Sequence, residues 1–310
     1  MEISEPEVIR DKSLMRSWSR SRRSNGQTLA LVPTMGFLHE GHLSLIRTAK
    51  SLADLTVVSI YINPGQFAPS EDLSTYPSDL AGDLRKLSDA GVSAVFCPSE
   101  LYISAPGNDF GGHLGAVNGE RVGASCLEDG GSGHETWITV ERLEKGMCGT
   151  SRPVFFRGVA TVVAKLFNIV EPDVAVFGKK DYQQWQIICR MVRDLDFAIK
   201  VIGSDIVREA DGLAMSSRNV HLSPEQREKA LSISRSLSKA KLAAEKGLKN
   251  CQHLKDLVRQ TISEADGKID YVEIVEQQGL KPVEEISCPV VLCVAAWFGN
   301  VRLIDNLEID

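Results

Sequence analysis

Short apolar runs alternate with amphipathic stretches over the first two thirds of the chain. Apolar runs of strand length occur at residues 29–33, 55–62, 94–97, 174–177 and 199–202. Between them, apolar residues at helical spacing predict helices over residues 42–52, 80–90, 159–170 and 182–192. Strands that alternate with helices favour an α/β fold with a parallel sheet. Ligands of such sheets bind beyond the carboxyl ends of the strands, so the polar segments there are the places to search.

The pattern changes after about residue 205. Ser223 is a good N-cap followed by proline, and it predicts a long charged helix over 224–246 that ends at Gly247. A second helix is predicted near 254–265, and strand-like runs follow at 271–275, 290–298 and 301–304. We therefore expect an α/β domain over residues 1–204 and a smaller α+β domain over residues 205–310. Residues 104–134 are rich in Gly and Ser, which predicts a surface loop or insertion.

Composition indicates an ordinary globular protein. The 310 residues are 43% hydrophobic and 25% charged, with a formal net charge of -6. An acidic chain does not attract nucleic acid or anionic membrane in general, so a phosphate site must be local. No stretch approaches the roughly 20 apolar residues that span a bilayer. The acidic N-terminal residues argue against a transit peptide. The seven cysteines include no CxxC pair, which favours reduced thiols in the cytosol over a disulfide framework or a zinc site.

The segment Met35-Gly36-Phe37-Leu38-His39-Glu40-Gly41-His42 follows the first predicted strand. Its glycines allow close backbone approach, and it opens a helix whose free N–H groups attract phosphate. If His39 and His42 lie on the first helical turn, they share a face and can donate hydrogen bonds to phosphate oxygens. A lone histidine is more often a cap or a core residue. Two histidines and two glycines at a strand-to-helix junction favour a nucleotide site, and their spacing is not that of a zinc protease.

Other polar segments follow the later strands. In Gly178-Lys179-Lys180-Asp181, Lys180 can reach phosphate as a point charge. In Met215-Ser216-Ser217-Arg218, two hydroxyls beside an arginine suit polyphosphate. Gln66 and Gln184 each offer a donor and an acceptor to a small polyhydroxy acid. Taken alone, each of these segments is more simply a charged turn, a polar loop or a solvated glutamine.

Together the segments resemble the HxGH nucleotidyltransferase superfamily. More narrowly, residues 32–42, 62–67, 151–153, 177–184 and 208–219 resemble the pantothenate synthetase (pantoate–β-alanine ligase) family in its plant-type form. The resemblance implies a Rossmann-like N-terminal domain, a smaller C-terminal lid domain and a homodimer. It implies that ATP and pantoate give pantoyl adenylate and pyrophosphate with Mg²⁺ assisting. The amine of β-alanine then attacks the acyl carbon, giving pantothenate and AMP.

The same resemblance implies the site residues. The residues expected to bind ATP are Met35, Gly36, Phe37, Leu38, His39, Glu40, Gly41, His42, Gly178, Lys179, Lys180, Asp181, Val207, Met215, Ser216, Ser217 and Arg218. Gln66 and Gln184 are expected to hold pantoate, and Phe67 could pack on its methyl groups. The family assigns proton donation to His42, but pyrophosphate leaves without needing a proton. We therefore expect the catalytic set to stabilise charge as cations or donors; its members are His39, His42, Lys180 and Arg218.

The chain departs from the family pattern at two places. Phe37 stands where many members have a small residue. Val154-Phe155 follows Arg152-Pro153 where many bacterial members carry a histidine near β-alanine, so the β-alanine contacts cannot be carried over. The metal ligands cannot be named either, and Asp83 is interpreted as an outer-shell acid or a solvated helix acid.

Two other functions remain open from the sequence. The first is another adenylyl or cytidylyl transferase on the same fold, which the intact Gln66 and Gln184 argue against. The second is a nucleotide sensor without turnover, which the presence of both histidines, Lys180 and Arg218 argues against.

Overall fold

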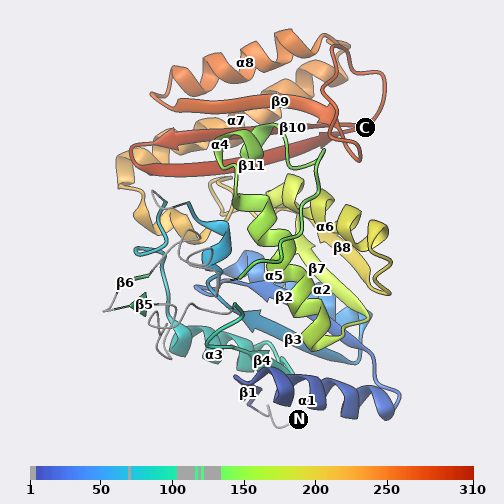
Figure 1. Cartoon of the computed structure of the whole chain (residues 1–310). Helices are drawn as coiled ribbons and strands as arrows, with labels where there is room; N and C mark the ends of the chain where they lie inside the picture. The colour runs from blue at the N-terminus through green and yellow to red at the C-terminus, as the bar shows by residue number, and fades with distance from the viewer. Residues whose placement is uncertain (1–4, 69–70, 103–115, 118–119, 122–133) are drawn as a thin grey trace.

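The computed structural model describes residues 5–68, 71–102, 116–117, 120–121 and 134–310 (Figure 1). The loop predicted over residues 104–134 lies almost entirely outside these ranges. Within it the structure describes β5 (Ala116–Val117) and β6 (Glu120–Arg121), which pair antiparallel.

A six-stranded parallel sheet forms the first part of the molecule. Its strands are β1 (Glu7–Ile9), β2 (Leu29–Thr34), β3 (Leu55–Ile60), β4 (Ala94–Phe96), β7 (Val174–Gly178) and β8 (Lys200–Ser204). They are ordered β1-β4-β3-β2-β7-β8, and each neighbouring pair is parallel. The strand order therefore reverses between β2 and β7, which is where α/β sheets of this kind bind ligands.

Helices cover both faces of this sheet. They are α1 (Lys12–Ser24), α2 (Glu40–Leu52), α3 (Leu80–Asp89), α5 (Phe155–Val170) and α6 (Tyr182–Asp194). In β2, Leu29 and Leu31 pack in the core shared with α1, α5 and α6, whereas Ala30 and Val32 pack with α2 and α3. Because both faces are buried, the strands are near-continuous apolar runs, as the sequence showed.

A three-stranded antiparallel sheet with two helices forms the second part. Its elements are α7 (Pro224–Glu245), α8 (Cys251–Ser263), β9 (Lys268–Glu276), β10 (Val290–Phe298) and β11 (Val301–Ile309), with strand order β11-β10-β9. The predicted N-cap Ser223 is confirmed, since its hydroxyl accepts from the Gln226 N–H. One face of the sheet packs on α7 and α8. The other face meets the first part through Val291 and Cys293, which contact Tyr182 and the short helix α4 (Met147–Ser151).

The α/β class with a smaller second sheet is confirmed. The last parallel strand ends at Ser204, whereas the helix that opens the second part begins at Pro224. The division at residues 204 and 205 therefore falls in the connection between them and stays a prediction. No helix within the described ranges is long and apolar enough to cross a membrane.

Candidate active site

A cavity of about 790 Å³ lies at the carboxyl ends of β2, β3, β7 and β8. Met35, Tyr61 and Asp205 line it directly beyond β2, β3 and β8. Gly178, the last residue of β7, lines it as well. Trp297 and Arg302 of the second sheet also line it, so the cavity lies between the two parts of the molecule. Its place beyond the carboxyl ends of the strands is the one expected from the sequence.

The cavity brings together most of the residues named from the sequence. Those that line it are Met35, His39, Gly41, His42, Gln66, Gly178, Lys180, Asp181, Gln184, Val207, Met215, Ser216, Ser217 and Arg218. The residues not among the lining are Gly36, Phe37, Leu38, Glu40 and Lys179. Four of those five belong to the turn and first helical residue after β2, and the fifth precedes Lys180.

The carboxylate of Asp83 holds the turn after β2 by hydrogen bonds to its backbone. Its carboxylate accepts from the N–H groups of Phe37 and Leu38, both at 2.7 Å, and its side chain is 1% exposed. Phe37 has φ 52°, a left-handed conformation that costs energy for a residue with a side chain. The two hydrogen bonds offset that cost. The interpretation of Asp83 as a solvated helix acid is therefore wrong, because its carboxylate is buried and braces the turn. Its interpretation as an outer-shell acid stays a prediction.

His39 and His42 form a reciprocal cap at the start of α2. His39 is the N-cap, and its Nδ1 accepts from the Gly41 N–H at 3.1 Å. The Nδ1 of His42 accepts from the His39 N–H at 3.3 Å, and the ring centroids lie 4.1 Å apart. The expectation that both lie on the first helical turn holds for His42 only. Because both Nδ1 atoms accept, the neutral rings carry their protons on Nε2 and can donate from that side.

Glycine at position 41 is what lets the His39 ring fold over the helix start. A Cβ atom there would lie 2.8 Å from both Cε1 and Nδ1 of that ring, closer than carbon atoms pack. Gly41 therefore leaves room for the His39 ring, in addition to allowing a ligand to approach the backbone.

The pKa values of both imidazoles lie well below physiological pH, which favours the neutral rings. Burial, followed by the charge of Lys180, lowers the pKa of His39 to about 4. Burial, followed by His39 and Lys180, lowers the pKa of His42 to about 3. Of the two roles expected from the sequence, the histidines fit that of hydrogen-bond donor rather than that of cation.

Lys179 and Lys180 point to different surroundings. The turn that carries them, η4 (Lys179–Asp181), follows β7 directly. Lys179 Nζ lies 2.8 Å from a Glu308 oxygen and 3.2 Å from an Asp205 oxygen. Lys180 lines the cavity, and the described residues give it no ion pair. Lys180 is thus the cation of this turn that is available to a ligand.

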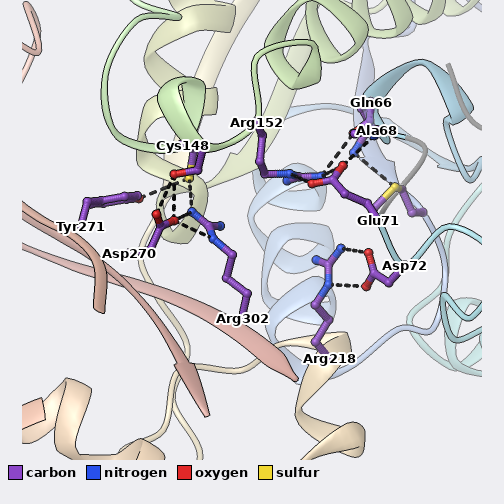
Figure 2. A network of polar contacts seen from close by, with 12 residues as sticks. Gln66, Ala68, Glu71, Asp72, Cys148, Arg152, Arg218, Asp270, Tyr271 and Arg302 are labelled. Atoms are coloured by element: carbon purple, nitrogen blue, oxygen red, sulfur yellow. Dashed lines mark hydrogen bonds and ion pairs between the residues drawn. The ribbon is translucent and has the colours of Figure 1, made fainter. Parts of the chain in front are cut away.

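Carboxylates already bind two of the cavity's arginines (Figure 2). Arg218 forms a bidentate pair with Asp72, at 2.7 and 3.0 Å, and Arg152 pairs with Glu71. Burial would raise the pKa of Asp72, but the hydrogen bond and charge of Arg218 outweigh it, so that pKa is lowered. Sequence reasoning missed both acids. The acidic pair at 71 and 72 between the Gln66 segment and the first following helix was a signal that could have found them.

Arg218 belongs to a segment that connects the second part of the chain to the turn after β2. The N–H of Met215 donates to the Val207 carbonyl at 3.0 Å. Ser217 Oγ donates to the Phe37 carbonyl at 3.2 Å. These bonds bring residues 207 and 215–218, expected to bind ATP, against the histidine pair.

The predicted pantoate ligand Gln66 is fixed by its neighbours. Its Oε1 accepts from Asn63 Nδ2 at 2.9 Å, and its side chain is buried. Its segment packs directly on helix α5, because a Cβ atom at Gly158 would lie 1.9 Å from the Gly65 carbonyl oxygen. Phe67 is fully buried and is not among the residues that line the cavity, and its expected contact with pantoate methyl groups stays a prediction.

Phe155, of the Val154-Phe155 pair that follows Arg152-Pro153, supports Arg152. The guanidinium carbon lies 3.8 Å from the centroid of the Phe155 ring, a cation–π contact. On the opposite wall, Arg302 of β11 binds Asp270 at 2.7 Å and Cys148 Sγ at 3.5 Å (Figure 2). Arg302 thus connects α4 to the second sheet and lines the cavity.

Comparisons with known proteins agree on one family. The family model described as pantoate-beta-alanine ligase matches residues 7–308. A pantoate–beta-alanine ligase of Oryza sativa subsp. japonica is 67% identical over 99% of this chain and 97% of its own. The crystal structure of a pantoate-beta-alanine ligase (pantothenate synthetase) from Thermus thermophilus has a TM-score of 0.83 and 36% identity, covering 97% of this chain and 99% of that one. A Francisella tularensis pantoate-beta-alanine ligase, complexed with beta-gamma ATP and beta-alanine, has a TM-score of 0.73 and 29% identity, covering 97% of each chain.

Proposed function

The chain belongs to the pantoate-beta-alanine ligase family, and we propose that it joins pantoate to β-alanine through a pantoyl adenylate made from ATP. The observation that carries this proposal is the set of side chains that line one cavity. Two histidine donors, Lys180 and Arg218 gather at the start of α2, and two glutamine side chains lie at the same cavity. The family structure that holds an ATP analogue and β-alanine supports the choice of substrates.

The first step is proposed as adenylation. A carboxylate oxygen of pantoate attacks the α-phosphorus of ATP, the bond to the β-phosphate oxygen breaks, and pyrophosphate leaves with the bonding electrons. Negative charge grows on the non-bridging and leaving oxygens, so donors fixed beforehand stabilise the transition state more than the ground state. His39 and His42 provide neutral Nε2–H donors, and Lys180 provides a point charge. None of these roles requires a proton transfer to pyrophosphate.

The second step is proposed as acyl transfer. The amine of β-alanine attacks the acyl carbon of pantoyl adenylate, the acyl carbon–oxygen bond breaks, and AMP leaves as the amine loses a proton. Gln66 and Gln184 would hold the pantoyl part through both steps, because an amide can accept from a hydroxyl and donate to a carboxylate oxygen.

Arg218 must exchange partners for ATP to use it. In this structure its two donor groups are bound by Asp72. A triphosphate carries more charge than one carboxylate and accepts the same bidentate geometry. We therefore place Arg218 at the polyphosphate in the bound state, with Asp72 released.

Magnesium is proposed to enter with the nucleotide. No group of three or more His, Cys, Asp or Glu side chains that could hold a metal occurs among the residues that the structure describes. Magnesium at nucleotide sites commonly relies on phosphate oxygens, water and one or two carboxylates. Asp181, which lines the cavity beside Lys180, fits that role. The ion would supply charge neutralisation of the leaving pyrophosphate. A homodimer in the cytosol is proposed as well, on the family resemblance alone.

Exchange of labelled pyrophosphate into ATP tests the function directly. We expect exchange that depends on pantoate and needs no β-alanine, because the adenylation step is reversible on its own. Folded, pure protein that shows no exchange with pantoate would refute the proposal. Exchange that another carboxylic acid or a nucleotidyl acceptor supports better would favour a different transferase. ATP binding without turnover would favour the sensor.

Gln66→Ala is expected to weaken pantoate selectively. Loss of one buried hydrogen bond to a charged or polar ligand should raise the KM for pantoate by about 10-fold, with the KM for ATP changed by less than about 2-fold. Steady-state exchange at varied substrate gives both constants. Gln183→Ala is the matched control, because Gln183 is not among the residues that line the cavity and its amide nitrogen donates to the carbonyl groups of Leu143 and Gly146. Equal losses for pantoate and ATP in Gln66→Ala would contradict the assignment.

A further inference from the structure

The turn that carries Lys180 is too short to fix that side chain by itself. It is a single 3₁₀ turn with no buried residue, and no side chain caps its start at Gly178. Three residues of 3₁₀ helix supply little internal hydrogen bonding. The position of Lys180 must therefore depend on contacts from elsewhere in the fold.

Those contacts come from β11 in the second sheet. The amide Nδ2 of Asn306 donates to the carbonyl oxygens of both Lys179 and Lys180, each at 2.9 Å. The side chain is 5% exposed, so water competes little for these bonds. In Figure 1, β11 is the strand of its sheet that faces the parallel-sheet domain.

Asn306 is itself held rigidly. Its backbone N–H donates to an Asp305 carboxylate oxygen at 2.8 Å. Asp305 is 4% exposed and forms a bidentate pair with Arg208, at 2.7 and 2.9 Å. Arg208 follows Val207, which lines the cavity. The support of the lysine turn therefore runs back to a second segment that lines the cavity.

The chemistry of the amide group suits this place. An –NH₂ group offers two donors from one atom, and two carbonyl oxygens face it. A carboxylate of the same shape would set oxygen against oxygen, and an aliphatic side chain would leave two buried acceptors without a partner.

We propose that Asn306 is a positioning residue for adenylation: it fixes the backbone of the Lys180 turn, and thereby the place of the Lys180 ammonium group at the nucleotide. This inference rests on the proposed function. It adds that a residue of the second sheet positions Lys180. Misplacement of such a group by about 1 Å can cost on the order of 100-fold in rate.

A double-mutant cycle on the full chain tests the proposal. Asn306→Ala should lower kcat for pantoate-dependent pyrophosphate exchange by about 10- to 100-fold, with the KM for pantoate changed by less than about 2-fold. In a Lys180→Ala background the same substitution should cause no further loss, because the group it positions is gone. Asn306→Asp should be at least as slow as Asn306→Ala. Losses that multiply in the double variant would overturn the proposal.

Glu308→Gln is the matched control at the same contact between the two parts. Glu308 binds Lys179 and Tyr182 but makes no bond to the Lys180 peptide group. It should lower the melting temperature while leaving kcat within about 2-fold, and an equal loss of kcat there would show that any damage to this contact slows the reaction. If Asn306→Ala does not fold, Asn306→Ser enters the same cycle. Wild-type protein without exchange would refute the proposed function, whereas active wild type with a normal Asn306→Ala would refute only this inference.

Discussion

Lys180→Ala should reduce kcat for pantoate-dependent exchange by about 100- to 1,000-fold, the loss typical of one preorganised electrostatic group. Lys180 lines the cavity, and the described residues give it no ion pair. Its charge is therefore available to the phosphates, and its removal should leave the melting temperature nearly unchanged. Rapid-quench measurement of pantoyl adenylate formation, beside thermal unfolding, separates these two effects.

Lys179→Ala is the matched comparison for that result. It removes the same charge one residue away, but from a side chain that binds Glu308 and Asp205. We expect a loss of less than about 3-fold, since two carboxylates already bind this ammonium group and Lys179 is not among the residues that line the cavity. A loss as large as that of Lys180→Ala would instead support the sequence prediction that both lysines contact ATP. A collapse of the fold in Lys180→Ala would show that the lysine is structural.

His42→Ala should lower kcat by a similar factor, about 100-fold or more. It removes the Nε2–H donor and also the Nδ1 acceptor that holds the His39 N–H. Two near-isosteric variants separate these losses. The amide nitrogen introduced by His42→Gln would lie near the position of Nε2, whereas the polar atoms introduced by His42→Asn would lie near Nδ1. If His42 acts as a neutral donor, His42→Gln should retain clearly more activity than His42→Asn.

The pH dependence of the wild type gives a second check on His42. A pKa lowered to about 3 means that the ring has already lost its extra proton far below neutral pH. Activity should therefore not fall between about pH 6 and about pH 8 through loss of a histidine proton. If His42 donated its proton as an imidazolium, kcat/KM would fall across this range, and His42→Gln and His42→Asn would be equally slow.

The sequence predicted most strands and helices of the parallel sheet because the strands are near-continuous apolar runs and the helices carry apolar residues at helical spacing. It missed β1 and α1. Strand β1 has three residues and, among the described strands, pairs with β4 alone. Helix α1 buries little apart from Met15 and Ser19. The Asp11 side chain caps α1 by accepting from two N–H groups, and an Asp before an amphipathic stretch was a signal that could have found this helix.

Site residues were predictable where several polar side chains occur in one short segment. They were not predictable where their role depends on contacts between distant segments. The histidine–glycine segment and Lys180 follow strands, so local pattern was enough to select them. Asp72 and Arg218 are 146 residues apart, and no local pattern connects them. Asp83 appeared to be an ordinary helix acid because its role depends on a turn 45 and 46 residues earlier.

Asn306 and the peptide group it supports are separated by 126 residues. During synthesis, the ribosome therefore completes the parallel sheet and its lysine turn long before it adds the strand that braces them. Domains generally fold in the order in which they are made. A growing chain that has formed the parallel sheet therefore still lacks the residues of the second part that line the cavity, and it also lacks the support of Asn306 for the Lys180 turn. Recovery of pantoate-dependent exchange would then measure when β11 packs against that turn.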